Sequence, residues 1–213
     1  MCSATTPMSG VAARMLNRLQ VRERQEMNEA RFNHDHYLIR RKVLKLFGGA
    51  FHIYDDQGNL VLYSKMKAFK LREDIRLYSD ESMGEELLAI SARSWADFST
   101  VYDVRDAAGA AVGSLQRKGF RSLFRDRWTL MDATGREIGM IQEDSAVMAF
   151  LRRTILEVLP QKYSVTVGDR EVATMKQNFN PFVFKLRVDL SGNRGSQLDP
   201  RLALAAGVLL SAV

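Results

Sequence analysis

The sequence contains almost no cysteine and nothing that marks it for secretion. Cys2 is the single cysteine of the 213 residues, which excludes a disulfide framework and a cysteine-based zinc site and favours a reducing compartment. Residues 1–20 lack the continuous apolar stretch of a secretory signal. Arg14 and Arg18, with no acid before Glu23, give this stretch a faint likeness to a transit peptide. A frayed end that leads into a surface helix is the favoured interpretation.

Motifs of the common enzyme classes are also lacking. The sequence has no Gly-x-Ser-x-Gly elbow, no P-loop and no dinucleotide-binding glycine pattern. His34-Asp35-His36 places two histidines on one face of a strand, but no third metal ligand accompanies them, and a solvated start of a strand is favoured. The segment 55–59 lacks the ligand spacing of a calcium loop and is interpreted as a turn. We therefore predict that the protein is not an enzyme and holds no cofactor and no metal.

Positive charge is present in excess and is unevenly placed. The net charge is +6, with nine Lys or Arg against four acids in residues 1–50 and five against one in residues 117–127. Such a bias favours anionic partners, either phospholipid headgroups or nucleic acid. Ordinary solvated basic faces explain any single cluster equally well.

Turn signals divide the middle of the chain into short β-rich runs. Asp supports a turn through its own side chain, and Gly supplies the positive φ that the turn needs. Turns of this kind occur at 56–58, 80–84, 106–109, 132–135 and 168–169. Each lies between two strand-like runs, which predicts five hairpins. With single strands at 37–46 and 182–190, this makes twelve strands, too many for one open sheet, so a closed barrel or a sandwich is required.

Two further patterns lie between these hairpins. Residues 145–159 follow an N-cap at Asp144 or Ser145 and have one apolar and one basic face, which predicts an amphipathic helix that ends before Pro160. The segment 67–70 (Lys-Ala-Phe-Lys) is echoed about fifty residues later by Lys-Gly-Phe-Arg, again between two predicted strands, which indicates a fold built from equivalent units.

The last segment, Asp199–Val213, is apolar on all sides. Asp199-Pro200 is typical of a helix start. Roughly twenty residues are needed to cross a bilayer and only about fourteen are present, so a helix buried in protein is favoured over a membrane span. We predict a mainly β (α+β) fold, a closed antiparallel barrel of about twelve strands around this helix. A partly helical N-terminal extension, residues 1–33, precedes the barrel domain, residues 34–213.

The order and number of these elements resemble the LURP-one-related family. The resemblance covers about residues 36–213 and depends on the strand–basic–strand units at 65–78 and 116–131, the segment 151–163 and the terminal helix. The family shares the architecture of Tubby C-terminal domains and phospholipid scramblases, in which an apolar helix threads a twelve-stranded barrel. The resemblance implies that basic residues on the barrel surface bind phosphoinositide headgroups. The cysteine cluster that scramblases use for acylation is absent here.

The first functional hypothesis is a module that binds phospholipid or phosphoinositide headgroups, or another anion, at a membrane surface. Several cations must converge for this, and arginine binds phosphate bidentately. The candidate cations come from the two basic units and are Lys65, Lys67, Lys70, Arg72, Lys118, Arg121, Arg125 and Arg127. This hypothesis predicts a cytoplasmic protein, or one that is peripheral at a membrane, with no transmembrane span.

The second hypothesis is a protein-interaction or scaffolding barrel with no lipid ligand. Its partner would bind residues 11–30, where Val11, Met15 and Leu19 form a short apolar seam that docks either onto this barrel or onto another chain. Nucleic-acid binding is a weaker option, because no recognised nucleic-acid-binding motif accompanies the charge.

Overall fold

A computed structural model of the protein describes the chain in seven ranges: residues 10–42, 49–66, 74–93, 100–117, 127–144, 161–178 and 183–212. The helices and strands in chain order are α1 (Gly10–Ala30), β1 (His36–Lys42), β2 (Gly49–Tyr54), β3 (Leu60–Met66), β4 (Asp74–Tyr78), β5 (Glu86–Ala92), β6 (Val101–Asp106), β7 (Ala111–Arg117), β8 (Arg127–Asp132), β9 (Glu137–Glu143), β10 (Lys162–Val167), β11 (Arg170–Gln177), β12 (Val183–Asp189), a 3₁₀ turn (Ser191–Asn193) and α3 (Pro200–Ala212). The amphipathic helix predicted at 145–159 lies outside the described residues.

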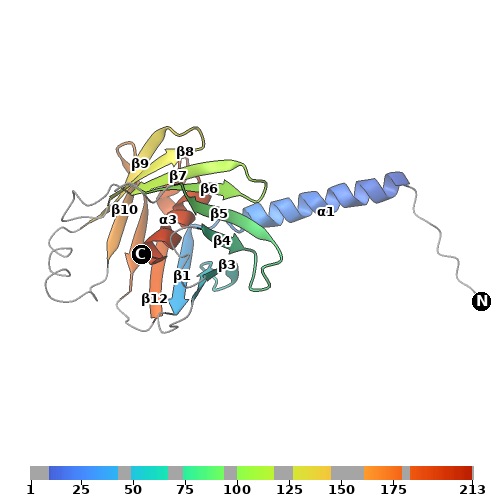
Figure 1. The fold of residues 1–213 in the computed structure, drawn as a ribbon, viewed down its shortest axis with the longest axis horizontal. Coiled ribbons are helices and arrows are strands. Elements are labelled where there is room, and N and C mark those ends of the chain that lie inside the picture. The colour runs from blue at the N-terminus through green and yellow to red at the C-terminus, as the bar shows by residue number, and fades with distance from the viewer. Residues whose placement is uncertain are drawn as a thin grey trace, which may run out of the picture. The chain divides into compact units, whose positions relative to one another are not determined.

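The twelve strands form one closed barrel (Figure 1). Each strand pairs antiparallel with the next in the sequence, and β12 pairs with β1 to close the ring. The closing pair runs over seven residue pairs, from His36 opposite Asp189 to Lys42 opposite Val183. Closure removes the unpaired edges that an open sheet would leave. The predicted closed barrel of about twelve strands is confirmed.

Three of the hairpins use the same aspartate turn. In the first, Asp55 Oδ1 accepts hydrogen bonds from the backbone N–H groups of Gln57 (3.0 Å) and Asn59 (2.7 Å). Asp106 and Asp132 accept the equivalent bonds two and four residues further along the chain. The glycines at the third position after the aspartate have φ between +81° and +85°, a conformation that a side chain would strain. The predicted turns at these places are confirmed.

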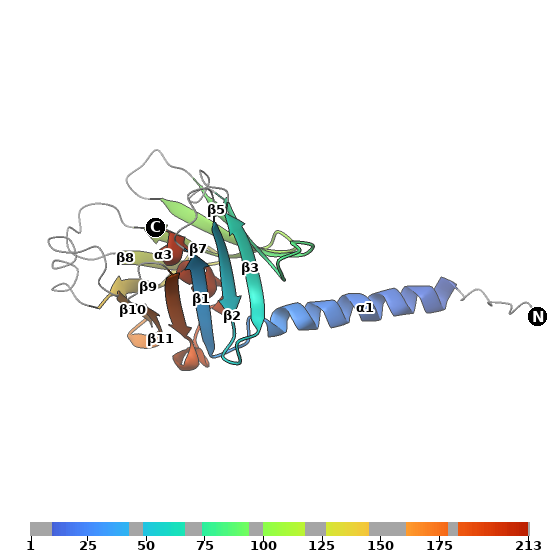
Figure 2. The ribbon, with the colours of Figure 1, turned by 90° about the horizontal axis from the view of Figure 1, so that it is seen from below.

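Helix α3 fills the inside of the barrel, as both ribbon views show (Figures 1 and 2). Its residues from Leu202 to Ser211 are all buried. A Cβ atom at Gly207 would lie 2.8 Å from Ile39 Cδ1 of β1, so the small residue permits close contact between helix and strand. At the helix start, Asp199 Oδ1 accepts a hydrogen bond from the Arg201 N–H (2.9 Å), which satisfies a free donor of the first turn. The predicted buried C-terminal helix is confirmed.

No helix among the described residues is long and apolar enough to span a membrane. Residues 1–33 and 34–213 form two separate compact units. The first contains α1, and the second contains the barrel with α3.

We expect residues 34–213 expressed alone to fold, because the barrel and the helix that fills it lie within this range. Circular dichroism and urea unfolding of this fragment should show a β-rich protein with one cooperative transition. A fragment of residues 60–213 serves as the control, since it lacks β1 and β2 and cannot close the barrel. An unfolded 34–213 fragment would show that the domain boundary is wrong.

We expect Leu204→Asp to prevent folding of the barrel domain. Leu204 is fully buried inside the barrel, and an unpaired buried charge costs about 3–5 kcal/mol, a large part of the total stability of a domain. Urea unfolding measures the effect, with Ala107→Asp at an exposed turn position as the matched control. A Leu204→Asp protein with wild-type stability would contradict the central position of α3.

A candidate anion-binding groove

The structure describes two of the eight predicted site residues. Lys65 is exposed on β3, and Arg127 is exposed at the start of β8, where its Nη2 donates a hydrogen bond to Gln142 Oε1 (3.2 Å). Strands β3 and β8 are not neighbours in the barrel, so these two cations lie apart. The other six lie outside the described residues. The convergence of the two basic units therefore stays a prediction.

A different set of cations does come together. Arg40 of β1, Lys176 of β11, and Lys185 and Arg187 of β12 line a groove of about 620 Å³. The three strands are neighbours because β12 pairs with β11 on one side and with β1 on the other. Closure of the barrel thus places residues from the two ends of the domain sequence around one hollow.

All four side chains belong to the outer face of the sheet. The residues that alternate with them are core residues, since Ile39, Leu186 and Val188 have 1% exposure or less. Successive side chains of a strand point to opposite faces. The outer faces of β11, β12 and β1 therefore carry the charge, while the inner faces of β1 and β12 pack against α3.

The strand register arranges these residues in two adjacent rows. One row runs across four strands: Lys176 of β11, Arg187 of β12, Leu38 of β1 and Tyr54 of β2, each directly opposite the next. In the other row Lys185 stands opposite Arg40. Directly opposite residues have Cβ atoms about 5 Å apart, so the four cations are close neighbours on a rigid sheet.

No carboxylate in the described part of the chain forms an ion pair with any of these four cations. Other cations of the barrel are neutralised: Lys162 Nζ lies 2.8 Å from Asp144 Oδ2, and Arg76 Nη1 lies 2.8 Å from Glu86 Oε1. The Nε of Arg40 is buried and has no hydrogen-bond partner among the residues that the structure describes. A buried donor without an acceptor costs free energy, and a bound anion would supply the acceptor.

The middle of the groove is apolar and aromatic. Leu38 and Tyr54 line it next to the cations. The Tyr54 ring stacks on His52 with centroids 6.3 Å apart, and His52 meets Tyr63 edge-on at 5.1 Å. A ligand whose phosphate faces the cations would therefore find a nonpolar surface beside them.

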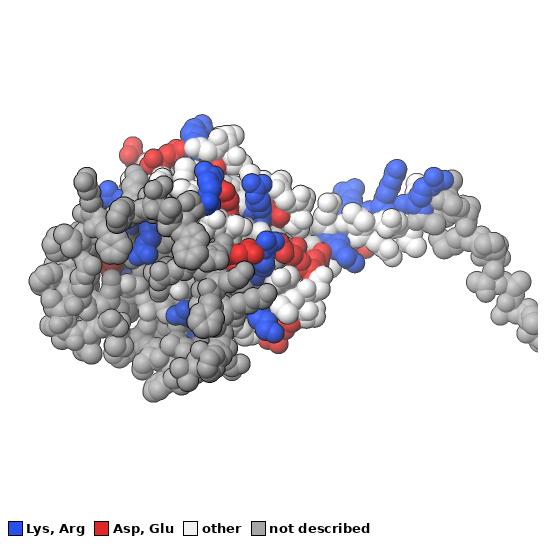
Figure 3. Space-filling model, viewed as in Figure 1, with Lys and Arg blue, Asp and Glu red and all other residues white. Residues whose placement is uncertain are grey.

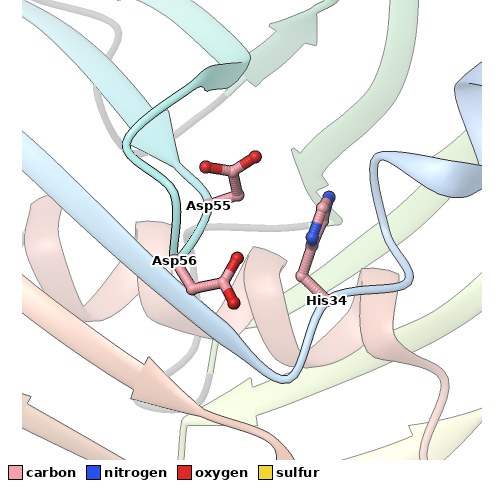
Figure 4. A group of neighbouring side chains, drawn as sticks. All are labelled: His34, Asp55 and Asp56. Carbon is pink, nitrogen blue, oxygen red and sulfur yellow. The ribbon is translucent and has the colours of Figure 1, made fainter.

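The far end of the groove is acidic and is built around the first aspartate turn. There His34, Asp55 and Asp56 bring three possible metal-ligand atoms within 4.8 Å of one another (Figure 4). Both oxygens of Asp55 are already engaged, because Oδ1 accepts two backbone N–H bonds and Oδ2 accepts one from Asn59 Nδ2 (2.9 Å). We assign this cluster to the support of the turn and not to a metal.

The pKa values of this end follow from its burial and its hydrogen bonds. Burial alone would raise the pKa of Asp55, but the hydrogen bonds from Asn59 and Gln57 outweigh it and hold the pKa below its usual range. Burial raises the pKa of Tyr37 to about 12. The hydrogen bond that the Tyr37 hydroxyl oxygen accepts from the His34 N–H (3.0 Å) acts in the opposite direction but is the smaller effect. Asp55 is therefore ionised and Tyr37 neutral at pH 7.

Sequence reasoning overlooked the cations of the groove. The available signal was weak: Lys185 and Arg187 flank Leu186, an alternation that puts both charges on one strand face. Arg40 lies far away in the sequence, and only the pairing of β1 with β12 brings it opposite Lys185.

Comparison with known proteins identifies the family. Residues 60–211 match the sequence model of the LURP-one-related family, which is more than half of the chain. The chain belongs to the LURP-one-related family. This is not a known enzyme family. The match runs from the first residue of β3 into α3 and includes Lys176, Lys185 and Arg187, whereas Arg40 precedes it.

No curated protein matches the chain. Among solved structures, the crystal structure of a protein from Arabidopsis thaliana is similar, with 17% sequence identity and a TM-score of 0.44. The alignment covers 82% of this LURP-one-related chain and 90% of the Arabidopsis chain.

We expect Asp55→Asn to destabilise the barrel at neutral pH and to have little effect in acid. A carboxylate with a depressed native pKa contributes stability above its unfolded pKa, and the contribution is lost as the pH falls through the lower native value. The difference in unfolding free energy between wild type and variant should therefore shrink below about pH 4. Urea unfolding over a pH series measures it, with Asp56→Asn at the exposed neighbouring position as control. A difference that is independent of pH would contradict this role.

Proposed function

We propose that this LURP-one-related protein is a non-enzymatic module that binds phospholipid headgroups, phosphoinositides among them, at a membrane surface. The phosphate binds in the groove beside Arg40, Lys176, Lys185 and Arg187. The observation that supports this most directly is the set of four neighbouring cations, which form no ion pair with a carboxylate of the seven described ranges. The eight cations of the two basic units stay candidates for further contacts with the same membrane.

Electrostatics favours an anion at this position. Neighbouring like charges repel each other and destabilise the free protein, so an anion placed between them gains from all four at once. Arg40 and Arg187 offer planar guanidinium groups that bind phosphate oxygens bidentately, and Lys176 and Lys185 add point charges. Strand pairing holds the four positions in register, so little ordering of the backbone is needed on binding.

The size and lining of the groove favour a headgroup over an extended polyanion. A volume of about 620 Å³ falls within the range of pockets for small ligands. Leu38 and Tyr54 line the groove beside the cations and can contact the nonpolar face of a headgroup or its glycerol. The carboxylates at the other end of the groove would repel a chain of phosphates that continued past the cations.

We expect Lys185→Glu/Arg187→Glu to abolish most binding to anionic vesicles. Loss of two charge-assisted contacts, each worth about 1.5–3 kcal/mol, weakens binding by more than roughly tenfold. Co-sedimentation of the full chain with phosphatidylcholine vesicles, with and without anionic lipid, measures it. Isothermal titration with a water-soluble inositol phosphate measures the groove without a bilayer.

The matched control is Lys65→Glu/Arg127→Glu, which makes the same change in net charge on strands that do not line the groove. We expect this control to retain binding of the inositol phosphate. Equal losses of inositol phosphate binding in both variants would show attraction by net charge and not by the groove. Equal retention of the wild type on neutral and anionic vesicles, at low and at high salt, would refute the proposed function.

A further inference from the structure

The first half of α1 carries apolar side chains that are exposed. Met15 is 67% exposed, Leu16 48% and Leu19 58%. At 100° per residue the three project within an arc of about 100° on one side of the helix. Exposed apolar residues on one helical face indicate a binding surface more strongly than residues scattered around the helix.

The charge of this half of the helix has one sign. Its charged residues are Arg14 and Arg18; Arg22 follows in the next turn, and the first acid is Glu23. The three arginines project beside one edge of the apolar arc. Figure 3 shows basic atoms along one edge of the N-terminal half of α1, next to uncharged atoms.

A second copy of the chain does not fit this surface. An intermolecular coiled coil needs an apolar seam over several heptads. Here the arc of Met15 and Leu19 continues into Arg22 and Glu26, which form an exposed ion pair of 2.9 Å with each other. The apolar seam thus ends after about two turns. This seam is shorter than the roughly three to four heptads over which a coiled coil sustains its apolar positions.

The surface fits an anionic lipid interface instead. A helix of low overall hydrophobicity, with arginines beside a narrow apolar face, lies in the plane of a membrane surface. Its apolar side chains enter the boundary between headgroups and acyl chains, and its arginines extend to the phosphates. The positive charge of this half complements anionic lipid.

We propose that the first half of α1 is an interfacial membrane anchor that is separate from the groove. Met15, Leu16 and Leu19 enter the interface, while Arg14 and Arg18 lie at the level of the lipid phosphates. The anchor does not depend on a headgroup in the groove. Because both contacts belong to one chain, binding at one raises the effective concentration of the other at the same membrane.

The test uses the full chain with Leu16→Ser/Leu19→Ser and a matched double variant, Val21→Ser/Gln25→Ser. Val21 is also exposed (51%) but projects from the opposite side of the helix. Co-sedimentation with vesicles of phosphatidylcholine and phosphatidylserine gives the lipid concentration for half-maximal binding. We expect Leu16→Ser/Leu19→Ser to raise it by roughly tenfold or more, since two leucines lose their burial, and the matched variant to leave it unchanged.

Isothermal titration with the inositol phosphate separates this proposal from the proposed function. Leu16→Ser/Leu19→Ser should leave this titration unchanged, because the groove holds none of these residues. If Lys185→Glu/Arg187→Glu binds vesicles and inositol phosphate normally while the leucine variant loses vesicle binding, the groove proposal fails and the anchor stands. Unchanged vesicle binding by the leucine variant would overturn the anchor. A wild-type dimer in analytical ultracentrifugation that this variant disrupts, with vesicle binding intact, would show a second copy as the occupant.

Discussion

The need to fill a closed barrel governs the rest of this structure. Twelve strands in a ring enclose a space too wide for their own inward side chains to fill, and α3 occupies it. The helix contributes an apolar surface against which strands such as β1, β7 and β12 pack their inner faces. Small residues such as Gly207 let the strands approach it closely. Without α3 the inner face of each strand would meet water and the ring would lose its main source of stability.

Because the inner faces of strands such as β1 and β12 pack against α3, the residues on their outer faces are free to be polar or charged. A strand residue belongs to one face or the other, so alternate positions can carry charge without cost to the core. On β1 and β12 this produces a row of core residues, such as Ile39 and Leu186, interleaved with the cations Arg40, Lys185 and Arg187. An anion that bound in the groove as proposed would therefore meet a scaffold that does not have to rearrange.

Closure also explains why the groove lies where it does. The closing pair of β1 and β12 is the one place where strands from the two ends of the domain sequence meet. The turn after β2 adds Asp55 and Asp56 to the other end of the same groove, which gives it opposite charge at its two ends. Helix α1 belongs to a separate unit and would give the protein a membrane contact with a different physical basis, apolar insertion in place of charge pairing.

The sequence by itself determined the elements whose causes are local. Asp199-Pro200 begins a helix because its carboxylate caps the first turn, and the hairpin at Asp55 forms because that side chain bonds to backbone groups two and four residues away. Counting such turns predicted twelve strands in a closed barrel or a sandwich, and the length and apolar character of the last helix favoured a barrel that this helix fills. Tertiary structure alone decided the groove, because Arg40 becomes the neighbour of Lys185 only through the pairing that closes the ring. Lys65 and Arg127 belong to the two basic units that the sequence predicted to converge, but they lie on strands that are not neighbours in the barrel. Sequence spacing predicts which charged side chains lie together only when they belong to the same strand or turn. Charged residues on different strands become neighbours only through strand pairing.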